Sequence, residues 1–477
     1  MTDSSSSPEQ AHTLDRSIGL FGNAVTILGA VSPAATIFVW VPVFLFLFGG
    51  FTWPALALGF LLQIPMALCY AELGSAYPLA GGEYSMISRS VSRGSGFVVF
   101  ILMMTLFVTL LPTAALGAGQ SLQVLWAGAD PRIVALVVIA AGAFLGILNI
   151  KEGAIFSGVL LACQLVAIAI VVVLGVMHAN APAPRLFSTE VWAPDGSLIP
   201  LSLKWALFSV SLGFLMMWGY GNAVVFGEET TDARKHMGRA VLIPLVVQGV
   251  LILLGAGALM VGAPSLKALA TAPAPVSYFI ETLAGGTLNN IVGGLVFLAL
   301  TEAVMLTCLI VGRELWSASR DNAWPTPVSR VLATLHPRYK SPWVATLVYA
   351  LMGAPLVFVS LASLLTIQGV VAVVVAGGIA VGALRIRFMK NAPADRWKMP
   401  LWPLPPIVAL LALVLVLTQQ TQHDLIICGA ILAAAAVYYF AFLKPRSKTH
   451  WVMAEVEEDG SLEVDVLAQP LPVPAES

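Results

Sequence analysis

The chain has 477 residues, of which 58% are hydrophobic and only 10% are charged, and its mean hydropathy is +0.90. Soluble proteins carry about a quarter of charged residues, so this composition excludes an ordinary soluble domain. The net charge of −1 gives no indication of a nucleic-acid partner.

Predominantly apolar runs recur along the whole chain, and each is long enough to cross about 30 Å of hydrocarbon as a helix. Because lipid offers the backbone no hydrogen-bond partner, such spans must be helical. The fold class expected is therefore an all-α integral membrane protein of about twelve transmembrane helices. The predicted spans are residues 20–46, 52–74, 96–124, 133–149, 154–177, 204–227, 240–262, 291–316, 343–360, 363–385, 403–419 and 424–443.

The distribution of basic residues predicts the orientation, because cytoplasmic loops carry the excess of Lys and Arg. With the N-terminus inside, all of the 24 Lys and Arg residues face the cytoplasm except Arg132, Arg185, Lys204 and Lys267. We therefore expect a multi-pass protein of the cytoplasmic (inner) membrane with both termini in the cytoplasm.

Helix-breaking residues interrupt spans 1 and 6 at corresponding places. Span 1 contains Gly29 followed by Ala-Val-Ser-Pro, and span 6 contains Trp-Gly-Tyr-Gly at 218–221. Paired breaks in two halves of a chain are typical of transporters that bind substrate between inverted repeats. A half-helix N-terminus suits a carboxylate, whereas carbonyl groups freed at a C-terminus suit an ammonium group. Simple kinks are the alternative interpretation.

The break in span 1 predicts where its second half-helix begins. Ser32 is a good N-cap and Pro33 is suited to the first helical position. Tyr220 or Trp218 is expected to cover the substrate by stacking or a cation–π contact, with plain packing as the alternative. The predicted substrate-binding residues are Ser32, Pro33, Ala34, Ala35, Trp218, Gly219, Tyr220 and Gly221.

Glu302 is the one ionisable residue deep inside a predicted span. An acid at such a depth costs roughly 2.5 to 3.5 kcal/mol, so it needs a partner, water or a proton. No Lys, Arg or His lies deep inside any predicted span to pair with it; Lys204, Arg313 and Arg385 lie at or near span ends. The hypothesis is that Glu302 carries a coupling proton or contacts a substrate ammonium group; a protonated structural acid is the alternative.

Three stretches resemble the amino acid, polyamine and organocation (APC) superfamily of transporters. They are YAELGSAYP at 70–78 with GGEY at 81–84, the segment 219–239 containing FGEET, and GRELWSASRDNAWP at 312–325. The resemblance covers about residues 14 to 445. It implies a five-plus-five inverted repeat with two further helices, substrate at the two breaks, and alternating access without ATP. The implied organisation is a cytoplasmic tail 1–17, a transport core 18–386 of spans 1–10, spans 11–12 in 387–443, and a cytoplasmic tail 444–477.

The chain also departs from the superfamily pattern. Many relatives have a glycine-rich triplet where this chain has Pro33-Ala34-Ala35, and many have an acid where it has Gly221. Some proton-coupled relatives place a lysine in span 5, and the corresponding residue here is Gln164. Because an amide does not titrate, Glu302 is the remaining candidate for proton coupling, and sodium coupling through uncharged oxygens stays open.

Charged residues at the cytoplasmic ends of spans predict an inner gate closed by ion pairs, with solvated helix ends as the alternative. The expected acids are Glu72 and Glu228, with Glu229 and Asp321 beside them. The expected bases are Arg313 and Arg320, with Arg89 and Arg93 beside them.

These observations predict a secondary active transporter, a proton-coupled symporter or an exchanger, of amino acids or related small amines. A polyamine or organocation exchanger, an ion channel and a receptor are the alternatives. An enzyme is not expected, because the interior offers no paired nucleophile and base. No cofactor or metal is expected either, because the six histidines lie in tails and loops without ligand spacing. The expected partners are a small-molecule substrate, a proton or sodium ion, and membrane lipid.

Overall fold

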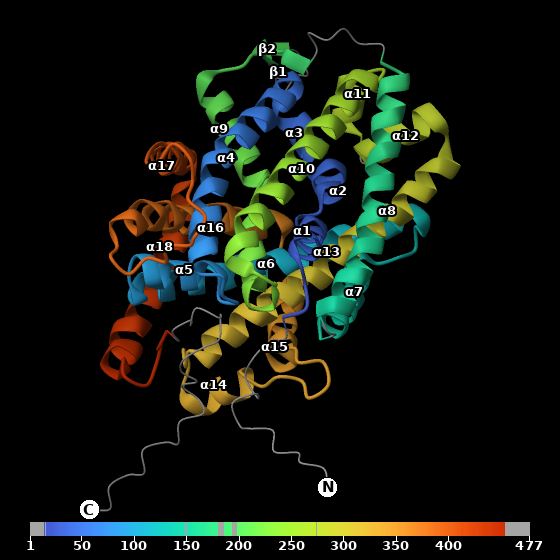
Figure 1. The fold of residues 1–477 in the computed structure, drawn as a ribbon. Coiled ribbons are helices and arrows are strands. Elements are labelled where there is room, and N and C mark those ends of the chain that lie inside the picture. Colours follow the sequence, from blue (N-terminus) through green and yellow to red (C-terminus); the bar gives the residue numbers. More distant parts are fainter. Residues whose placement is uncertain are drawn as a thin grey trace, which may run out of the picture.

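The computed structural model describes residue 14 and residues 16–147, 150–179, 186–192, 198–272 and 274–453, and this part is almost entirely helical (Figure 1). Eight helical segments are long and apolar enough to cross a membrane, and the first, Leu20–Ala76, contains two predicted spans. Three shorter apolar helices occupy the other predicted spans: Pro131–Gly146, Trp343–Phe358 and Leu404–Thr418. The predicted all-α membrane fold is confirmed.

The first span is broken where the sequence predicts. Helix α1 (Leu20–Val31) ends at Ser32, whose φ of 42° turns the chain out of the helix. Helix α2 (Pro33–Ala35) begins at Pro33, and the Ser32 hydroxyl accepts a hydrogen bond from the Ala35 N–H at 3.2 Å. Ser32 is therefore the N-cap of the second half-helix, as predicted. That half-helix continues through the π-helical turn η2 (Thr36–Trp40) into α3 (Val41–Phe48).

The sixth span is broken as well. Helix α9 (Leu203–Met216) ends two residues before Gly219, which has a φ of 110°. The chain continues as a 3₁₀ helix, η5 (Tyr220–Glu229). Only glycine adopts such a φ without strain, so Gly219 sets the geometry of this break.

The remaining elements follow in chain order and fill the other spans and connections. They are η3 (Gly49–Phe51), α4 (Thr52–Ala76), α5 (Gly82–Ser90), α6 (Arg93–Leu125), α7 (Pro131–Gly146), α8 (Ile150–Met177), β1 (Glu190–Trp192), β2 (Leu198–Pro200), α10 (Ala233–Gly262), α11 (Leu266–Thr271), α12 (Pro275–Ala284), α13 (Gly286–Arg320), α14 (Thr326–Leu332), α15 (Trp343–Gly353), η6 (Ala354–Phe358), α16 (Leu361–Arg385), η7 (Ile386–Phe388), α17 (Leu404–Thr418), α18 (Gln422–Tyr438), η8 (Tyr439–Leu443) and η9 (Lys444–Arg446). Strands β1 and β2 pair antiparallel, with Val191 opposite Ile199.

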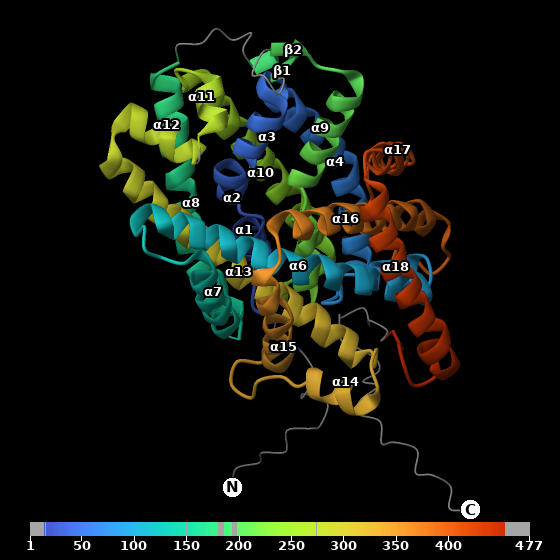
Figure 2. The ribbon, with the colours of Figure 1, turned by 180° about the vertical axis from the view of Figure 1, so that it is seen from behind.

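The helices pack around two long central elements. Helix α6 packs against α13, α16 and α7, and α4 packs against α9, α10 and α17. Small residues allow the close contacts that membrane helices favour. For example, a Cβ on Gly59 of α4 would lie 2.5 Å from the backbone nitrogen of Phe214 in α9. The β1–β2 hairpin lies at one end of the bundle and α14 at the other, which we call the inner end (Figures 1 and 2).

The segment after the last helix folds back onto the inner end. The N–H groups of Trp451 and Val452 donate to the carbonyls of Asn322 and Asp321 at 3.3 and 3.1 Å. The indole of Trp451 is buried and donates to the Arg93 carbonyl at 2.8 Å. Residues 450–453 of the predicted tail 444–477 therefore pack against the bundle, and residues 454–477 lie outside the described part of the chain.

This segment is expected to stabilise the inner end. The Trp451 ring lies 5.0 Å from the ring of Tyr84 and 5.3 Å from that of Phe97. Because truncating a buried Trp to Ala costs about 3–5 kcal/mol, Trp451→Ala should lower the melting temperature measured by size exclusion after heating. Trp126→Ala is the matched control, since that side chain is 65% exposed. Equal melting temperatures of the two variants would contradict the assignment.

Candidate substrate and coupling site

The structure brings the two helix breaks together. A Cβ on Gly219 would lie 2.6 Å from Cγ1 of Val31, the last residue of α1. Ser32 and Ala34, which follow Val31 in the chain, are buried. Trp218, which precedes Gly219, is half-buried. Both groups of predicted substrate-binding residues therefore adjoin one contact point between α1 and the α9–η5 break.

A continuous chain of hydrogen bonds leads from the first break to Glu302. The Ser32 hydroxyl donates to Gln164 Oε1 at 3.1 Å, and Gln164 Nε2 donates to Glu302 Oε2 at 2.7 Å. On its other oxygen, Glu302 accepts a hydrogen bond from the Ser157 hydroxyl at 2.6 Å. All four side chains are buried. The two predicted coupling residues, Gln164 and Glu302, are thus in direct contact and are joined to a predicted substrate-binding residue.

Glu302 also lies against the backbone of α1. A Cβ on Gly29 would collide with Glu302 Oε1 and would lie 2.8 Å from Ser157 Oγ. Gly29 therefore leaves the space that the carboxyl group occupies. Sequence reasoning does not find Ser157, although its spacing from Gln164, about two helical turns, places both on one face of α8.

Side chains satisfy the backbone groups freed by the second break. Gln63 Nε2 donates to the Phe214 carbonyl at 2.7 Å, and Gln248 Nε2 donates to the Met216 carbonyl at 3.3 Å. Such bonds are needed because lipid does not satisfy the last carbonyls of a helix. The carbonyls of Phe214 and Met216 therefore already have protein partners.

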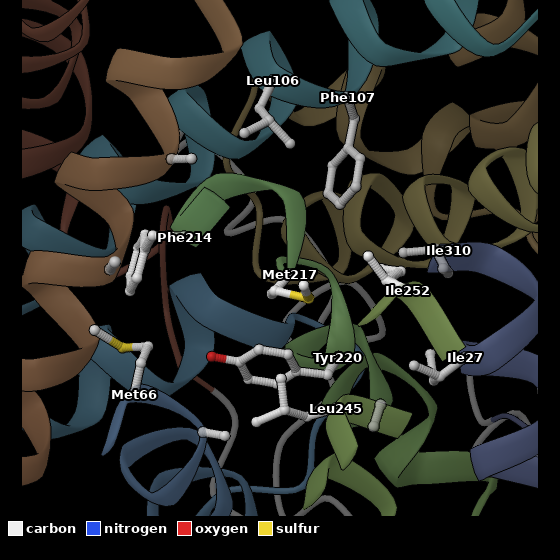
Figure 3. Close-up of a cluster of buried hydrophobic side chains, with 14 of the residues drawn as sticks. Ile27, Met66, Leu106, Phe107, Phe214, Met217, Tyr220, Leu245, Ile252 and Ile310 are labelled. Carbon is white, nitrogen blue, oxygen red and sulfur yellow. The ribbon is translucent and has the colours of Figure 1, made fainter. Parts of the chain in front are cut away.

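Tyr220 is buried rather than presented at an open surface. Figure 3 shows its ring among apolar side chains that include Met217 and Leu245. Its hydroxyl donates to Gln63 Oε1 at 2.5 Å, and its ring packs edge-on against Tyr70 at 5.7 Å. Trp218 also packs on Tyr70, at 5.9 Å. The aromatic cover predicted for the substrate stays a prediction, and Tyr70 joins the residues around this break. The other predicted glycine, Gly221, also adjoins Tyr70, because a Cβ there would lie 2.6 Å from Tyr70 Cδ1.

Two bidentate ion pairs link η5 to α13 at the inner end. Arg320 donates to Glu228 at 2.7 and 2.9 Å, and Arg313 donates to Glu229 at 2.5 and 2.9 Å. Arg313 is completely buried and Arg320 nearly so. The structure therefore joins four of the residues named for the inner gate in two ion pairs, Glu228 with Arg320 and Glu229 with Arg313.

The start of the chain is held against the same element. The N–H groups of Ser17 and Ile18 donate to the Glu229 carbonyl at 3.0 and 3.1 Å. Asn23 Nδ2 donates to the Ala223 carbonyl and to Thr230 Oγ1 at 3.1 and 3.0 Å. These bonds fix α1 against η5, so the inner end is closed in this conformation.

Glu72 lies elsewhere. Its carboxylate pairs with Arg387 at 2.6 Å and with Arg396 at 3.3 Å, and it accepts a hydrogen bond from the Met399 N–H at 3.1 Å. The expectation that Glu72 lies beside the arginines of α5, α6 and α13 is therefore wrong. Helix α4 ends against the segment that follows α16, which sequence spacing does not indicate.

A cavity of about 850 Å³ opens at the end opposite to the gate. Its walls come from η2 and α3, from α6, and from the α12–α13 region, with Phe38, Gln120 and Asn289 as examples. Every one of its described lining residues is uncharged. Among the described residues there is also no group of three His, Cys, Asp or Glu side chains placed to hold a metal.

Comparison with known proteins decides the family. The amino acid permease family model matches residues 11–442. The chain belongs to the amino acid permease family. This permease is 22% identical to the branched-chain amino acid permease BcaP of Lactococcus lactis, over 80% of this chain and 85% of that protein. It is 23% identical to the methylthioribose transporter of Bacillus subtilis, over 75% of this chain and 78% of that protein. It is 24% identical to the low-affinity putrescine importer PlaP of Escherichia coli, over 58% of this chain and 60% of that protein.

This membership confirms the predicted APC resemblance and the predicted function class. The permease is a multi-pass membrane transporter of the amino acid permease type and not an enzyme. The alternatives, a polyamine or organocation exchanger, an ion channel and a receptor, are not favoured.

The contact between the breaks makes a sharp prediction for Gly219→Leu. A leucine there requires a φ of 110° and places its Cβ 2.6 Å from Val31, so transport should fall to background. Gly377→Ala on α16 is the matched control, because a Cβ there meets nothing within 4 Å. Both variants are measured for uptake of labelled amino acids into proteoliposomes, with size exclusion as the test of folding. Wild-type uptake by Gly219→Leu would count against a site at the breaks.

Proposed function

We propose that this permease carries amino acids or related small amines across the cytoplasmic membrane, with the substrate held between the two breaks and a proton carried by Glu302. The observation that carries the proposal is the buried chain from Ser32 through Gln164 to Glu302. A proton on Glu302 changes which groups donate and accept along this chain. Such a change reaches Ser32, the cap of the half-helix at the proposed substrate site, so protonation and substrate binding are coupled.

The first break offers polar groups suited to an amino acid. Pro33 has no N–H, and the Ala35 N–H is bonded to the Ser32 hydroxyl, which leaves the Ala34 N–H as the one that the cap does not use. We assign the substrate carboxylate to this N-terminus of α2 and the ammonium group to the carbonyl end of α1, in accord with the directions of the two helix dipoles.

The cavity at the opposite end supports a substrate without a large net charge. A polyamine carries two or more positive charges and is attracted by a path lined with acids. The described lining of the cavity contains no acid, and Gly221 stands where many relatives carry one. The relatives include a permease for branched-chain amino acids and an importer for putrescine; the uncharged lining favours amino acids with neutral side chains.

We also propose that the inner end faces the cytoplasm, with both termini on that side. The basic residues Arg89, Arg234, Arg313 and Arg320 lie at this end, in agreement with the excess of positive charge in cytoplasmic loops. The test is labelling of a cysteine introduced at exposed Lys235 in intact cells and in inverted vesicles. Labelling by an impermeant maleimide in intact cells alone would contradict this orientation.

A ligand screen and an uptake assay test the substrate and the coupling. Amino acids, polyamines and simple amines are first compared by thermal shift, because a ligand stabilises the state that it binds. The ligand that stabilises most is then supplied, labelled, to proteoliposomes with either a proton gradient or a sodium gradient. We expect accumulation with the proton gradient alone. Accumulation with sodium alone would overturn the role of Glu302 as proton carrier while leaving the substrate site standing.

A further inference from the structure

A second pair of carboxyl groups lies at the inner end, apart from Glu302. Glu83 stands in the first turn of α5 and Glu314 stands on α13, and each side chain is only 1% exposed. Glu314 Oε1 lies 3.4 Å from the position that a Cβ would take on Gly82, the residue before Glu83. The charge of Glu83 acts directly on Glu314. Two acids from different helices therefore share one buried space.

This space contains no counter-charge within the described part of the chain. Oε1 of Glu314 has no hydrogen-bond partner there, and the group that faces the Glu83 carboxyl is the uncharged hydroxyl of Tyr70. The neighbouring guanidinium groups are committed to other acids, Arg313 to Glu229 and Arg320 to Glu228. An isolated buried carboxylate is unfavourable by several kcal/mol, on the order of the penalty for a buried ion without a partner. A proton bound to one of the two acids avoids having two carboxylates side by side in this space.

Tyr70 supplies an independent polar group aimed into the same space. Its hydroxyl is buried and faces the Glu83 carboxyl group as a hydrogen-bond donor, and it interacts electrostatically with Glu314 as well. The other titratable groups in electrostatic contact with this space are Tyr220 from η5 and Tyr349 from α15, and neither is cationic. Burial raises the pKa of Glu83 to about 7. A group of this kind exchanges its proton near neutral pH.

We propose that Glu83 and Glu314 together form a proton-binding site that holds one proton while the inner gate is closed and releases it to the cytoplasmic side when the gate opens. The bound form is one carboxyl group and one carboxylate, with the proton between them and the Tyr70 hydroxyl beside them. The site is distinct from Glu302, and the inference does not require that Glu302 be the coupling residue.

The position of the site explains how a proton there affects the gate. Tyr70 packs on Trp218 and Tyr220 at the second break, and Glu314 directly follows Arg313, which pairs with Glu229. Loss of the proton leaves two like charges between α5 and α13. Since the closed state has the raised pKa, it binds more protons than the open state at intermediate pH. Its stability is therefore full below the ordinary carboxyl pKa of the open state, falls as the pH rises towards about 7, and is lowest above that pH. High pH therefore favours opening.

Infrared difference spectroscopy of the full chain between about pH 6 and about pH 8.5 detects the bound proton directly. Exposed carboxyl groups are already ionised throughout this range, whereas a carboxyl group whose pKa is raised by burial changes protonation within it. The wild type should lose a protonated-carboxyl band as the pH rises, and Glu83→Gln and Glu314→Gln should each reduce or shift that band, because each variant removes one of its two acids. Glu281→Gln, at an exposed position, is the control and should retain it. Glu302→Gln should retain the band of this pair, which separates the inference from the proposed coupling role. A wild-type band in both pair variants would overturn the proposal.

Spin labels at exposed positions 235 and 330, on opposite sides of the gate, test the consequence. With the native cysteines replaced, the fraction of the longer distance should rise several-fold between about pH 6 and about pH 8, within the roughly tenfold per pH unit that one proton allows. The double variant Glu83→Gln, Glu314→Gln should show less than about a twofold change. An unaltered pH profile in that variant would contradict the proposal. If Glu83→Gln does not fold, Glu314→Gln alone carries both measurements, because it removes one of the two acids of the pair.

Discussion

Accumulation driven by a proton gradient is expected to be lost in Glu302→Gln, while substrate binding is retained. The amide keeps the size of the carboxyl group but holds no exchangeable proton. The introduced amide keeps the hydrogen bonds of the carboxyl group when the side-chain amide of Gln164 rotates by half a turn, which exchanges its oxygen and nitrogen. The Ser32 and Ser157 hydroxyls fit either arrangement, because a hydroxyl both donates and accepts. The variant should therefore fold. Equilibrium exchange of labelled substrate should continue at a rate within a factor of about three of the wild type, while the gradient-driven steady state should fall by at least about tenfold.

The matched control for this experiment is Gln248→Asn at the second break. Gln248 bonds to a backbone carbonyl and not to Glu302, so the conservative change should leave the proton dependence in place. Proton-driven accumulation by Glu302→Gln at the wild-type level would assign Glu302 to structure alone. Loss of amine binding in that variant would instead assign the residue to the substrate ammonium group.

The sequence predicts the spans and both breaks because these features are local. The length of each apolar run predicts a membrane-spanning helix. The breaks are predicted because Ser32, Pro33 and Gly219 each have a backbone preference that interrupts a helix. The importance of Glu302 is equally local, since an acid inside an apolar run is costly wherever its neighbours lie. These predictions need no knowledge of which helices are adjacent.

Partners across helices are what the sequence does not predict. Glu72 meets Arg387, more than 300 residues away in the chain, and neither residue carries a pattern that points to the other. Glu83 and Glu314 each look like an ordinary charge near a helix end until the fold places α5 against α13. Trp451 follows the last span in a polar segment, and its burial depends on an aromatic cluster made by α5 and α6.

The hydrogen-bond chain accounts for one departure from the superfamily pattern, the amide at position 164. An amide at position 164 donates to Glu302 and accepts from Ser32 at the same time, which a lysine ammonium group does not do. In the proposed mechanism the proton-binding group lies in span 8 rather than in span 5, and the link to the first half-helix is kept. Gly29 completes the arrangement, because a larger residue would exclude the carboxyl group from its place beside α1.

Arg313→Ala is expected to destabilise the closed protein more than any other change at the inner end. The guanidinium group is completely buried, binds Glu229 through two nitrogens, and donates to the Leu309 carbonyl at 3.0 Å. Removing one partner of a buried pair leaves an uncompensated charge and costs about 3–5 kcal/mol. Arg234→Ala is the matched control. Its partner Asp395 is 60% exposed, and such pairs contribute about 0–1 kcal/mol.

A double variant that changes Glu229 together with Arg313 distinguishes the effect of the ion pair on gate opening from its effect on stability. Replacing both Arg313 and Glu229 by apolar residues of similar size removes the unpaired charge, so much of the lost stability should return. The gate, however, has no ion pair in either variant, and both should open more often. Native Cys69 is completely buried next to Tyr70, so its rate of labelling by a small maleimide reports that opening. We expect faster labelling in Arg313→Ala and in the double variant than in Arg234→Ala; wild-type labelling rates in both would show that the pair stabilises the fold without controlling the gate.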